Sequence, residues 1–383
     1  MDCHHFDAGT CRSCAWLPRP YDDQLAAKQR RCVALIGDDV EWLPPFRSAE
    51  SGFRNKAKMV VSGTAQEPRL GILDDAGVGV DIRDCGLHVP AVRDALPVLA
   101  AFVTRAALTP YDLGTRRGEL KYVLVTASPD AELMVRFVSR SQEPVARLRK
   151  HLSWLEEALP NLVAVSLNLQ PEHKAVLEGD REIPLGGTGR LTMRMNGHRL
   201  HLRPQSFFQT NTEVAAGLYR ESQQWVDEVA PRSVWDLYCG VGGFALHVAA
   251  RGRAVVGVES SPEAVAAARE SAHEAGLQDV SFLAGDAAQF ALGTVGSSPD
   301  LVVVNPPRRG VGPELARWVE SSTVEHVLYS SCNPDSLARD LASMPSMSPV
   351  RARLFDMFPQ TSHAEVLLLL ERRHERGLPL GRD

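Results

Sequence analysis

The fold is decided by the stretch SVWDLYCGVGG, residues 233–243, which predicts a short β-strand followed by a glycine-rich turn. β-Branched and aromatic residues favour the strand, and Gly240 and Gly242 allow a tight turn into a following helix. Backbone N–H groups in such a turn can approach a ligand closely. The pattern is therefore typical of a nucleotide-like cofactor site at the edge of a parallel sheet.

The sequence after this stretch alternates short apolar runs with helical segments, as in a parallel sheet wound with helices. Ser261 followed by Pro262 predicts the start of one such helix. We expect residues 203–383 to form an α/β domain of the Rossmann-like class. Its further strands are predicted in AVVGVE, VSFLAGD, DLVVVNPP, HVLYSSC, VRARLFDMF and HAEVLLLLERR.

Residues 1–202 have a different pattern, in which apolar and polar residues alternate between turn residues. This predicts a separate α+β domain with antiparallel strands and with helices at residues 90–107 and 145–159. A length of 383 residues agrees with two domains. The predicted strands are FRNKAKMVVSG, RLGILDD, GELKYVLVTAS, LMVRFVSR, LVAVSLNLQ, KAVLEG and RLTMRMNGHRLHLRP.

Composition and charge restrict the class of protein. No apolar run approaches the length of a bilayer span, and the first residues lack the basic and apolar regions of a secretory signal. We therefore expect a cytoplasmic protein, a monomer without a membrane partner. A net charge of −5 argues against sequence-blind binding of a polyanion, so a nucleic acid would have to bind a local patch.

Acidic residues near the strand ends favour S-adenosylmethionine over a dinucleotide as the cofactor. The glycine spacing alone suits either ligand, and it also suits a turn without any ligand. Glu259, about twenty positions after the turn, ends the second strand and can bind ribose hydroxyls. Asp286 ends the third strand, where methyltransferases of this architecture place an acidic residue near the adenine, and Asp236 precedes the turn.

The sequence Asn305-Pro306-Pro307 follows the next strand and directs polar groups of Asn305 into the same crevice. Methyltransferases that act on amino groups carry a similar Asn-Pro-Pro, normally followed by an aromatic residue. Arg308 takes that place here, and the pair Arg308-Arg309 suits phosphate better than stacking on a base. An amino-methyltransferase is nevertheless one alternative hypothesis.

Methylation at C5 of uracil needs a nucleophile and a base, because C5 itself is a poor nucleophile. A thiolate that adds to C6 creates an enolate whose C5 attacks the methyl group, and a base then removes the C5 proton. Cys332 ends the strand HVLYSSC, and Glu365 leads into the last strand. A lone cysteine at a strand end is more often a packed hydrophobe, but the polar turn around Cys332 predicts that it faces a cavity.

The other cysteines divide into two kinds. Cys32 and Cys239 lack a polar setting and are predicted to be structural. Four thiolates suit either a zinc ion or an iron–sulfur cluster, and the residue pattern leaves both open. A non-catalytic iron–sulfur protein that binds RNA is the third hypothesis. The four candidate metal ligands are Cys3, Cys11, Cys14 and Cys85, with His4 and His5 as expected bystanders.

Basic and aromatic residues mark candidate RNA contacts. Spacing of two places Arg54, Lys56 and Lys58 on one face of a predicted strand, although a solvated strand face has the same pattern. Further candidates are Arg116, Arg117 and Lys121, and Arg203 beside Phe207 and Phe208.

Taken together, the motifs resemble those of the RNA uracil-C5 methyltransferases over nearly the whole chain. The resemblance is carried by the four cysteines and by GFRNKAKMV, RPQSFFQTN, DLYCGVGGF, VNPPRRG, YSSCNP and FDMFPQTSHAEV. It implies Cys332 as nucleophile, Glu365 as base and a [4Fe-4S] cluster on the four cysteines. It also implies that four residues contact S-adenosylmethionine or line the active site, namely Gln209, Tyr238, Glu259 and Asn305. The glycine turn and the third strand add Gly240 and Asp286 as candidate cofactor contacts.

Two departures from the broader family narrow the expected substrate. The cysteines begin at residue 3, which leaves no room for an N-terminal RNA-binding barrel, and Asn305 stands where many relatives have Asp. Both features are similar to those of the short ribosomal branch, which forms 5-methyluridine at position 747 of 23S ribosomal RNA. A transfer RNA or another ribosomal uridine is the alternative target.

Overall fold

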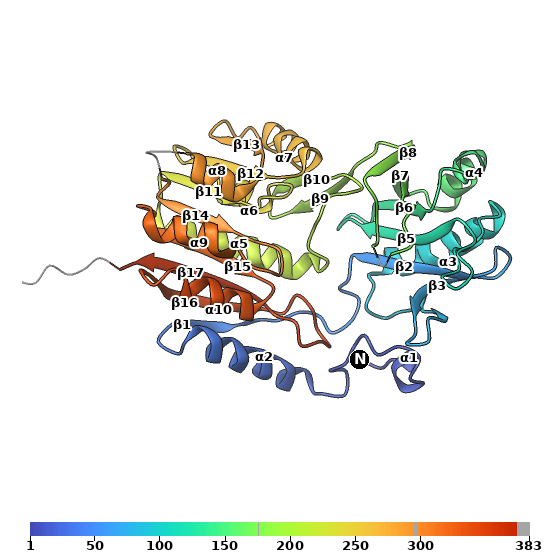
Figure 1. Cartoon of the computed structure of the whole chain (residues 1–383), viewed down its shortest axis with the longest axis horizontal. Coiled ribbons are helices and arrows are strands. Elements are labelled where there is room, and N and C mark those ends of the chain that lie inside the picture. The colour runs from blue at the N-terminus through green and yellow to red at the C-terminus, as the bar shows by residue number, and fades with distance from the viewer. Residues whose placement is uncertain (175, 295–297, 374–383) are drawn as a thin grey trace, which may run out of the picture.

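The largest of the three β-sheets in the described part of the chain is built mainly from the C-terminal half. The computed structural model describes residues 1–174, 176–294 and 298–373, and eight strands form this sheet in the order β1-β16-β17-β15-β14-β11-β12-β13 (Figure 1). Every strand predicted after residue 232 is confirmed, and with them the Rossmann-like α/β class. The strands are β1 (Glu41–Phe46), β11 (Ser233–Leu237), β12 (Ala254–Glu259), β13 (Val280–Ala284), β14 (Leu301–Val304), β15 (His326–Ser331), β16 (Met347–Phe355) and β17 (Glu365–Arg372).

Helices cover both faces of this sheet, and the strands accordingly bury both faces. Strands β11 to β15 are parallel, while β17 runs antiparallel to β15 and β16. Because successive side chains in a strand point to opposite faces, Val234 enters one core and Trp235 enters the other. One face packs α5 (Thr212–Val229), α6 (Gly243–His247) and α7 (Pro262–Glu274), and the other packs α8 (Ala287–Gly293), α9 (Gly312–Ser321) and α10 (Pro334–Ala342).

The second sheet has seven strands in the order β4-β3-β2-β5-β6-β7-β8 and lies beside the first (Figure 1). Two helices, α3 (Pro90–Arg105) and α4 (Val145–Ala158), pack on one of its faces, as predicted. The strands are β2 (Lys56–Gly63), β3 (Pro68–Leu73), β4 (Gly79–Asp81), β5 (Leu120–Ala127), β6 (Leu133–Ser139), β7 (Leu162–Leu169) and β8 (Arg181–Gly187).

Three details of the prediction were wrong. The second sheet is not purely antiparallel, because α4 crosses over and makes β6 and β7 parallel. The segment 174–179, in which residue 175 lies outside the described residues, contributes no described strand, since Gly179 there bonds to the side chain of Asn168 and β8 starts at Arg181. The stretch RLTMRMNGHRLHLRP forms two strands of a separate hairpin rather than one strand of this sheet.

The N-terminal segment returns to the C-terminal sheet. After the short α1 (His4–Asp7), helix α2 (Tyr21–Ile36) runs along β16, and β1 extends the sheet at its edge (Figure 1). A hairpin of β9 (Leu191–Met195) and β10 (His198–Leu202) packs on α7. The division at residue 202 therefore stays a prediction. It separates most strands of the two large sheets, but α2 and β1 precede residue 202 and pack with the C-terminal sheet. None of the described helices is long and apolar enough to cross a membrane.

Candidate active site

The predicted site residues of the C-terminal half gather at one edge of the eight-stranded sheet. Strand pairing aligns Leu237 with Val304 and Val304 with Tyr329, so parallel strands end there together. The residues that follow these ends are Tyr238, Asn305 and Cys332. A crevice at the carboxyl ends of parallel strands is the usual ligand site of this architecture.

The glycine-rich turn is held in shape by Glu259. Gly240 and Gly242 have φ angles of +54° and +85°, and a Cβ atom at Gly242 would lie 2.9 Å from the ring of Phe282. Gly240 N–H donates to Glu259 Oε2 at 3.2 Å, and Ser261 N–H donates to Glu259 Oε1 at 2.9 Å. Glycine is thus needed at position 242 for both conformation and space.

Acidic and aromatic residues surround this turn. Tyr238 has a φ angle of +68°, and burial together with the nearby Asp286 raises the pKa of its hydroxyl. Asp286 caps α8, because its Oδ1 accepts from Gln289 N–H at 2.9 Å. Asp236 is buried, its Oδ2 accepts from Ala245 N–H at 2.8 Å, and burial raises the pKa of its carboxyl to about 7. Its Oδ1 has no hydrogen-bond partner among the described residues.

Gln209 lies in the segment that joins β10 to α5. Its side chain is 7% exposed, and its backbone carbonyl accepts from Asn55 Nδ2 at 3.0 Å. Asn55 N–H also donates to Thr210 O at 2.8 Å. The residue just before β2 therefore fixes the position of the Gln209 segment. Nothing in the sequence around Asn55 indicated this role, because its partners lie more than 150 positions away.

Cys332 and Glu365 lie across from each other on neighbouring strands. The antiparallel register pairs Ser331 with Val366, so the next pair along is Cys332 and Glu365. Glu365 is 1% exposed, and its Oε1 accepts from Ser330 Oγ at 2.5 Å and from Asn305 Nδ2 at 3.5 Å. Burial raises the pKa of the Glu365 carboxyl to about 7, although both hydrogen bonds oppose this shift. A carboxylate with this pKa suits proton abstraction at neutral pH.

The Cys332 thiol is half-buried between a carboxylate and a guanidinium. Burial and the charge of Glu365 raise its pKa, and the charge and hydrogen bond of Arg308 lower it. Arg308 is held in place because its backbone oxygen accepts from Asn333 Nδ2 at 2.9 Å and its Nη2 lies 2.8 Å from His363 Nδ1. Sequence reasoning had assigned Arg308 only to phosphate. His363 faces Arg308 in the structure.

The other missed residue in this group is Ser330. It lies in β15, two positions before Cys332, and its hydroxyl donates to the Glu365 carboxylate that also raises the pKa of the Cys332 thiol. That spacing was a usable signal for a partner of the catalytic residues.

The four candidate metal ligands form a separate group beside the seven-stranded sheet. Burial, together with the nearby thiols of Cys85, Cys11 and Cys3, raises the pKa of the Cys14 thiol to about 12. His5 Nε2 lies 2.7 Å from Asp84 Oδ1, which ties the first helix to the Cys85 loop. Cys32 and Cys239 are buried in hydrophobic cores, in agreement with the structural role predicted for them.

The candidate RNA contacts differ in exposure and in the hydrogen bonds that they make. Lys56 and Lys58 alternate with buried residues of β2 as predicted, whereas Arg54 lies before the strand and its Nε donates to Lys56 O at 3.1 Å. Lys121 does not serve as a surface cation, because it is buried and donates to Glu172 O at 2.7 Å. Phe207 is 71% exposed next to Gln209, whereas Phe208 is only 7% exposed. Phe207 is therefore the aromatic residue of this segment that a base can reach.

Comparisons with known proteins agree with this geometry. A family model described as tRNA (Uracil-5-)-methyltransferase matches residues 190–373. A curated protein from Halothiobacillus neapolitanus, named 23S rRNA (uracil(747)-C(5))-methyltransferase RlmC, is 52% identical over 97% of this chain and 100% of its own length. A protein of the same name from Yersinia pestis is 48% identical over 97% of this chain and 100% of its own length.

A solved structure supports the fold over both sheets. It is the crystal structure of Pyrococcus abyssi tRNA (uracil-54, C5)-methyltransferase in complex with S-adenosyl-L-homocysteine. The likeness has a TM-score of 0.78 with 24% sequence identity, and it covers 93% of this chain and 85% of that one.

Proposed function

This chain belongs to the family of RNA uracil-C5 methyltransferases, and we propose that it forms 5-methyluridine at position 747 of 23S ribosomal RNA. It is an enzyme that uses S-adenosylmethionine as methyl donor. The observation that carries the ribosomal substrate is the match over the full length of curated relatives that act on this uridine by name. We also propose a cytoplasmic monomer.

Cys332 is the proposed nucleophile. Its thiolate adds to C6 of the target uracil, which makes C5 electron-rich, and S-adenosylmethionine supplies the electrophilic methyl group. Arg308 supports this role, because a guanidinium beside the thiol favours the charged form over the neutral one. It offsets part of the effect of burial and of the Glu365 carboxylate.

Glu365 is the proposed base that removes the C5 proton, after which the thiolate leaves C6. Its pKa near 7 leaves a substantial fraction of carboxylate at neutral pH. Ser330 and Asn305 donate hydrogen bonds to Oε1 and so orient the carboxylate. Asn305 thus has a role here that does not require an amino group as methyl acceptor.

The proposed binding site for S-adenosylmethionine is the crevice around the glycine turn. Backbone N–H groups near Gly240 are accessible there, because its Cβ position would meet only open space. Glu259 and Asp286 offer carboxylate oxygens for hydroxyl and amino groups of the cofactor. The proposed contacts are Gln209, Tyr238, Gly240, Glu259, Asp286 and Asn305.

The four cysteines fit an iron–sulfur cluster, and we propose a [4Fe-4S] cluster with a structural or RNA-facing role. The thiols of Cys14 and Cys85 each interact electrostatically with those of Cys3 and Cys11, and Arg54 lies close to Cys14 and Cys85. Sulfur atoms around one zinc ion, each about 2.3 Å from it, would lie roughly 3.8 Å apart. Among the described residues, His4, His5 and Asp84 beside the cysteines bring three ligand atoms within 4.8 Å of one another, but no three of the four sulfurs form such a group. We propose a cluster rather than a single zinc ion because the four-cysteine pattern resembles that of the family.

The substrate is tested by mapping 5-methyluridine by mass spectrometry in ribosomal and transfer RNA from a strain that lacks the gene. We expect position 747 of 23S ribosomal RNA to lose its methyl group and to regain it with the wild-type gene, but not with Cys332→Ala. Loss of the modification from transfer RNA instead would contradict the proposed substrate. An N-methylated product, or normal turnover by Cys332→Ala, would contradict the mechanism.

The covalent step is tested with RNA that carries 5-fluorouracil. This base has no C5 proton to remove, so the enzyme should remain attached to it through Cys332. A band of slower mobility on a denaturing gel is the expected result, and Cys332→Ala should abolish it.

A further inference from the structure

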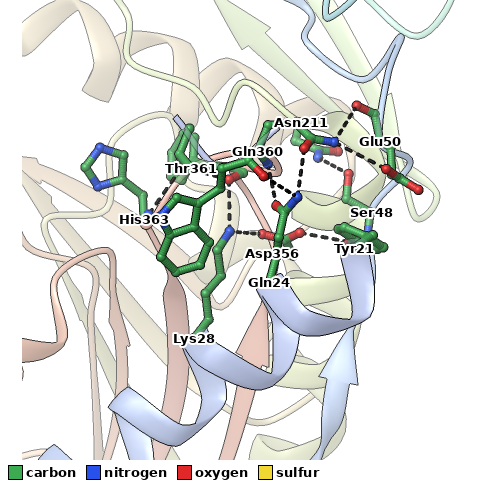
Figure 2. Close-up of polar contacts among 12 residues, drawn as sticks. Tyr21, Gln24, Lys28, Ser48, Glu50, Asn211, Asp356, Gln360, Thr361 and His363 are labelled. Carbon is green, nitrogen blue, oxygen red and sulfur yellow. Dashed lines mark hydrogen bonds and ion pairs between the residues drawn. The ribbon is translucent and has the colours of Figure 1, made fainter. Parts of the chain in front are cut away.

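A buried polar network joins helix α2 to the loop that precedes Glu365 (Figure 2). Lys28 Nζ lies 2.6 Å from Asp356 Oδ1, and both side chains are 0% exposed. Tyr21 Oη donates to Asp356 Oδ2 at 2.8 Å, and Lys28 Nζ also donates to Phe358 O at 3.0 Å. The loop of residues 356–363, here called the base loop, is thus held at its first end by charged and polar groups of α2.

Gln360 lies at the middle of the base loop in a strained conformation. Its φ angle is +66°, which is unusual for a residue other than glycine and must be maintained by surrounding contacts. Gln360 N–H donates to Gln24 Oε1 at 2.9 Å, and Gln24 Nε2 donates to Gln360 Oε1 at 2.8 Å. Trp16 N–H donates to Gln360 O at 2.9 Å. The N-terminal segment therefore occupies both backbone groups of Gln360 and its side-chain oxygen.

Both ends of this network reach proposed functional groups. The base loop leads directly to Glu365, and His363 within the loop lies against Arg308, the partner of Cys332. Trp16 lies two residues after Cys14, whose backbone oxygen accepts from Leu17 N–H at 3.0 Å. A change in the turn at Cys14 would therefore move the group that holds Gln360.

Simple attachment of α2 to the sheet does not require this chemistry. Apolar side chains of similar volume would hold the helix as well as a buried ion pair does, because burial of the charges costs about as much as their attraction returns. Directional hydrogen bonds differ in that they fix the geometry of a backbone segment. The network is therefore better suited to setting the shape of the base loop than to adding stability.

We propose that Trp16, Gln24 and Lys28 are positioning residues that hold the base loop in the shape which aims Glu365 at the substrate. We further infer that this shape depends on the state of the four-cysteine site through the turn at Cys14. The proposal rests on the proposed function for the roles of Glu365 and of the cysteines. It assigns to the N-terminal segment a part in the last chemical step, the removal of the C5 proton.

Gln24→Leu tests the positioning role, because leucine has a similar volume but neither donates nor accepts a hydrogen bond. With ordinary uracil RNA, a misplaced base should stall the reaction after methyl transfer, so that the covalent RNA adduct accumulates. We expect tritium release from C5-labelled uridine to fall at least tenfold while KM for RNA changes less than twofold. Gln29→Leu, on the same helix but outside the network, is the matched control.

Glu365→Gln serves as the reference for a stalled adduct. If it accumulates no adduct, the assignment of the base fails, and this outcome is separate from the behaviour of Gln24→Leu. If Glu365→Gln accumulates the adduct but Gln24→Leu loses adduct formation and tritium release equally, or loses neither, the positioning role is refuted.

Hydrogen exchange measured by mass spectrometry tests the coupling without any activity. In Cys14→Ser we expect peptides that cover residues 356–364 to exchange at least threefold faster than in the wild type, while peptides from β12 keep their rates. The same comparison on wild-type protein before and after removal of iron covers the case in which Cys14→Ser fails to fold. Unchanged exchange of residues 356–364 on loss of iron would overturn the coupling.

Discussion

At the scale of single residues, Glu365 combines burial with a chemical task that needs its charge. Burial raises the pKa of its carboxyl from 4.5 to about 7. Between these two values the unfolded chain releases the proton while the folded protein keeps it. The folded state therefore loses stability as the pH rises from about 4 to 7. The loss reaches about 3 kcal/mol once the carboxyl is ionised in both the folded and the unfolded state.

Glu365→Gln should accordingly be more stable than the wild type above pH 7, although it is inactive. Glutamine stays neutral and still accepts a hydrogen bond from Ser330. We expect its free energy of unfolding in urea to exceed that of the wild type by up to about 3 kcal/mol at pH 8 and to match it at pH 4. A variant that is less stable than the wild type at pH 8 would show that the burial of this carboxyl is not the dominant cost.

Arg308 is expected to control how readily Cys332 ionises. Its positive charge lies beside the thiol and lowers the thiol pKa against the effects of burial and of Glu365. In Arg308→Met, the pH profile for alkylation of Cys332 by iodoacetamide should move at least one unit to higher pH, because an adjacent charge typically shifts a pKa by about one to three units. Mass spectrometry of the free enzyme gives the rate without any contribution from RNA binding.

The neighbouring residue provides the control for this experiment. Arg309→Met removes the same charge from the same loop but leaves the guanidinium at the thiol in place. Equal profiles for the two variants would contradict the role of Arg308.

The sequence predicted Cys332 and Glu365 better than it predicted their partners. Both residues adjoin ends of recognisable strands, so the sheet edge on which they lie could be inferred from the alternation of strands and helices. The contact of Arg308 with Cys332 forms only when the loop after β14 folds onto the turn after β15. No local pattern encodes that contact, since the two segments are separated by a whole helix and strand.

At the scale of elements, the segment between β10 and α5 presents one aromatic ring to solvent and buries the next. Phe207 is 71% exposed, and Phe208 is 7% exposed. An exposed ring next to the proposed cofactor contact Gln209 is suited to stacking on a base, an interaction worth about 1–3 kcal/mol. Phe208 instead contributes to the core around α5.

Phe207→Ala should therefore weaken RNA binding by about tenfold while the thermal stability of the enzyme remains unchanged. We expect the loss to show as a higher KM for RNA with an unchanged kcat, and Phe207→Trp should restore binding. Phe208→Ala, by contrast, should lower the free energy of unfolding by roughly 3 kcal/mol or more. If Phe207→Ala and Phe208→Ala behave alike, the distinction between a stacking ring and a core ring is wrong.

The elements that sequence analysis missed include α2 and β1, besides β4, β8 and α5. Pro44 and Pro45 lie within β1 and argue against a strand, but they are tolerated because β1 pairs with β16 at the edge of the sheet and its register shifts there. Helix α2 buries polar residues such as Gln24 and Lys28 on its inner face, so its apolar periodicity is weak. The failure at α2 thus arises from the polar network that this helix makes with the distant residues 356–360.

At the scale of the whole molecule, the four-cysteine site connects two parts of the chain that belong to different sheets. Cys3, Cys11 and Cys14 precede the helix that packs on the eight-stranded sheet, whereas Cys85 follows β4 of the seven-stranded sheet. Metal binding to ligands that the unfolded chain does not hold together contributes directly to folding. A cluster at this position would therefore stabilise the arrangement of the two sheets as well as the N-terminal segment.

Cys85→Ser tests this connection. Wild-type protein purified without oxygen should contain about four iron atoms per chain, as expected for one [4Fe-4S] cluster, and should absorb visible light. We expect Cys85→Ser to lose most of the iron and the colour and to unfold at a lower temperature, because one of the four ligands and the link between the sheets are removed together. Iron analysis and thermal unfolding followed by circular dichroism provide the two measurements. Cys32→Ser, which alters a buried cysteine outside the site, should keep its iron, and zinc in place of iron in the wild type would contradict the proposed cluster.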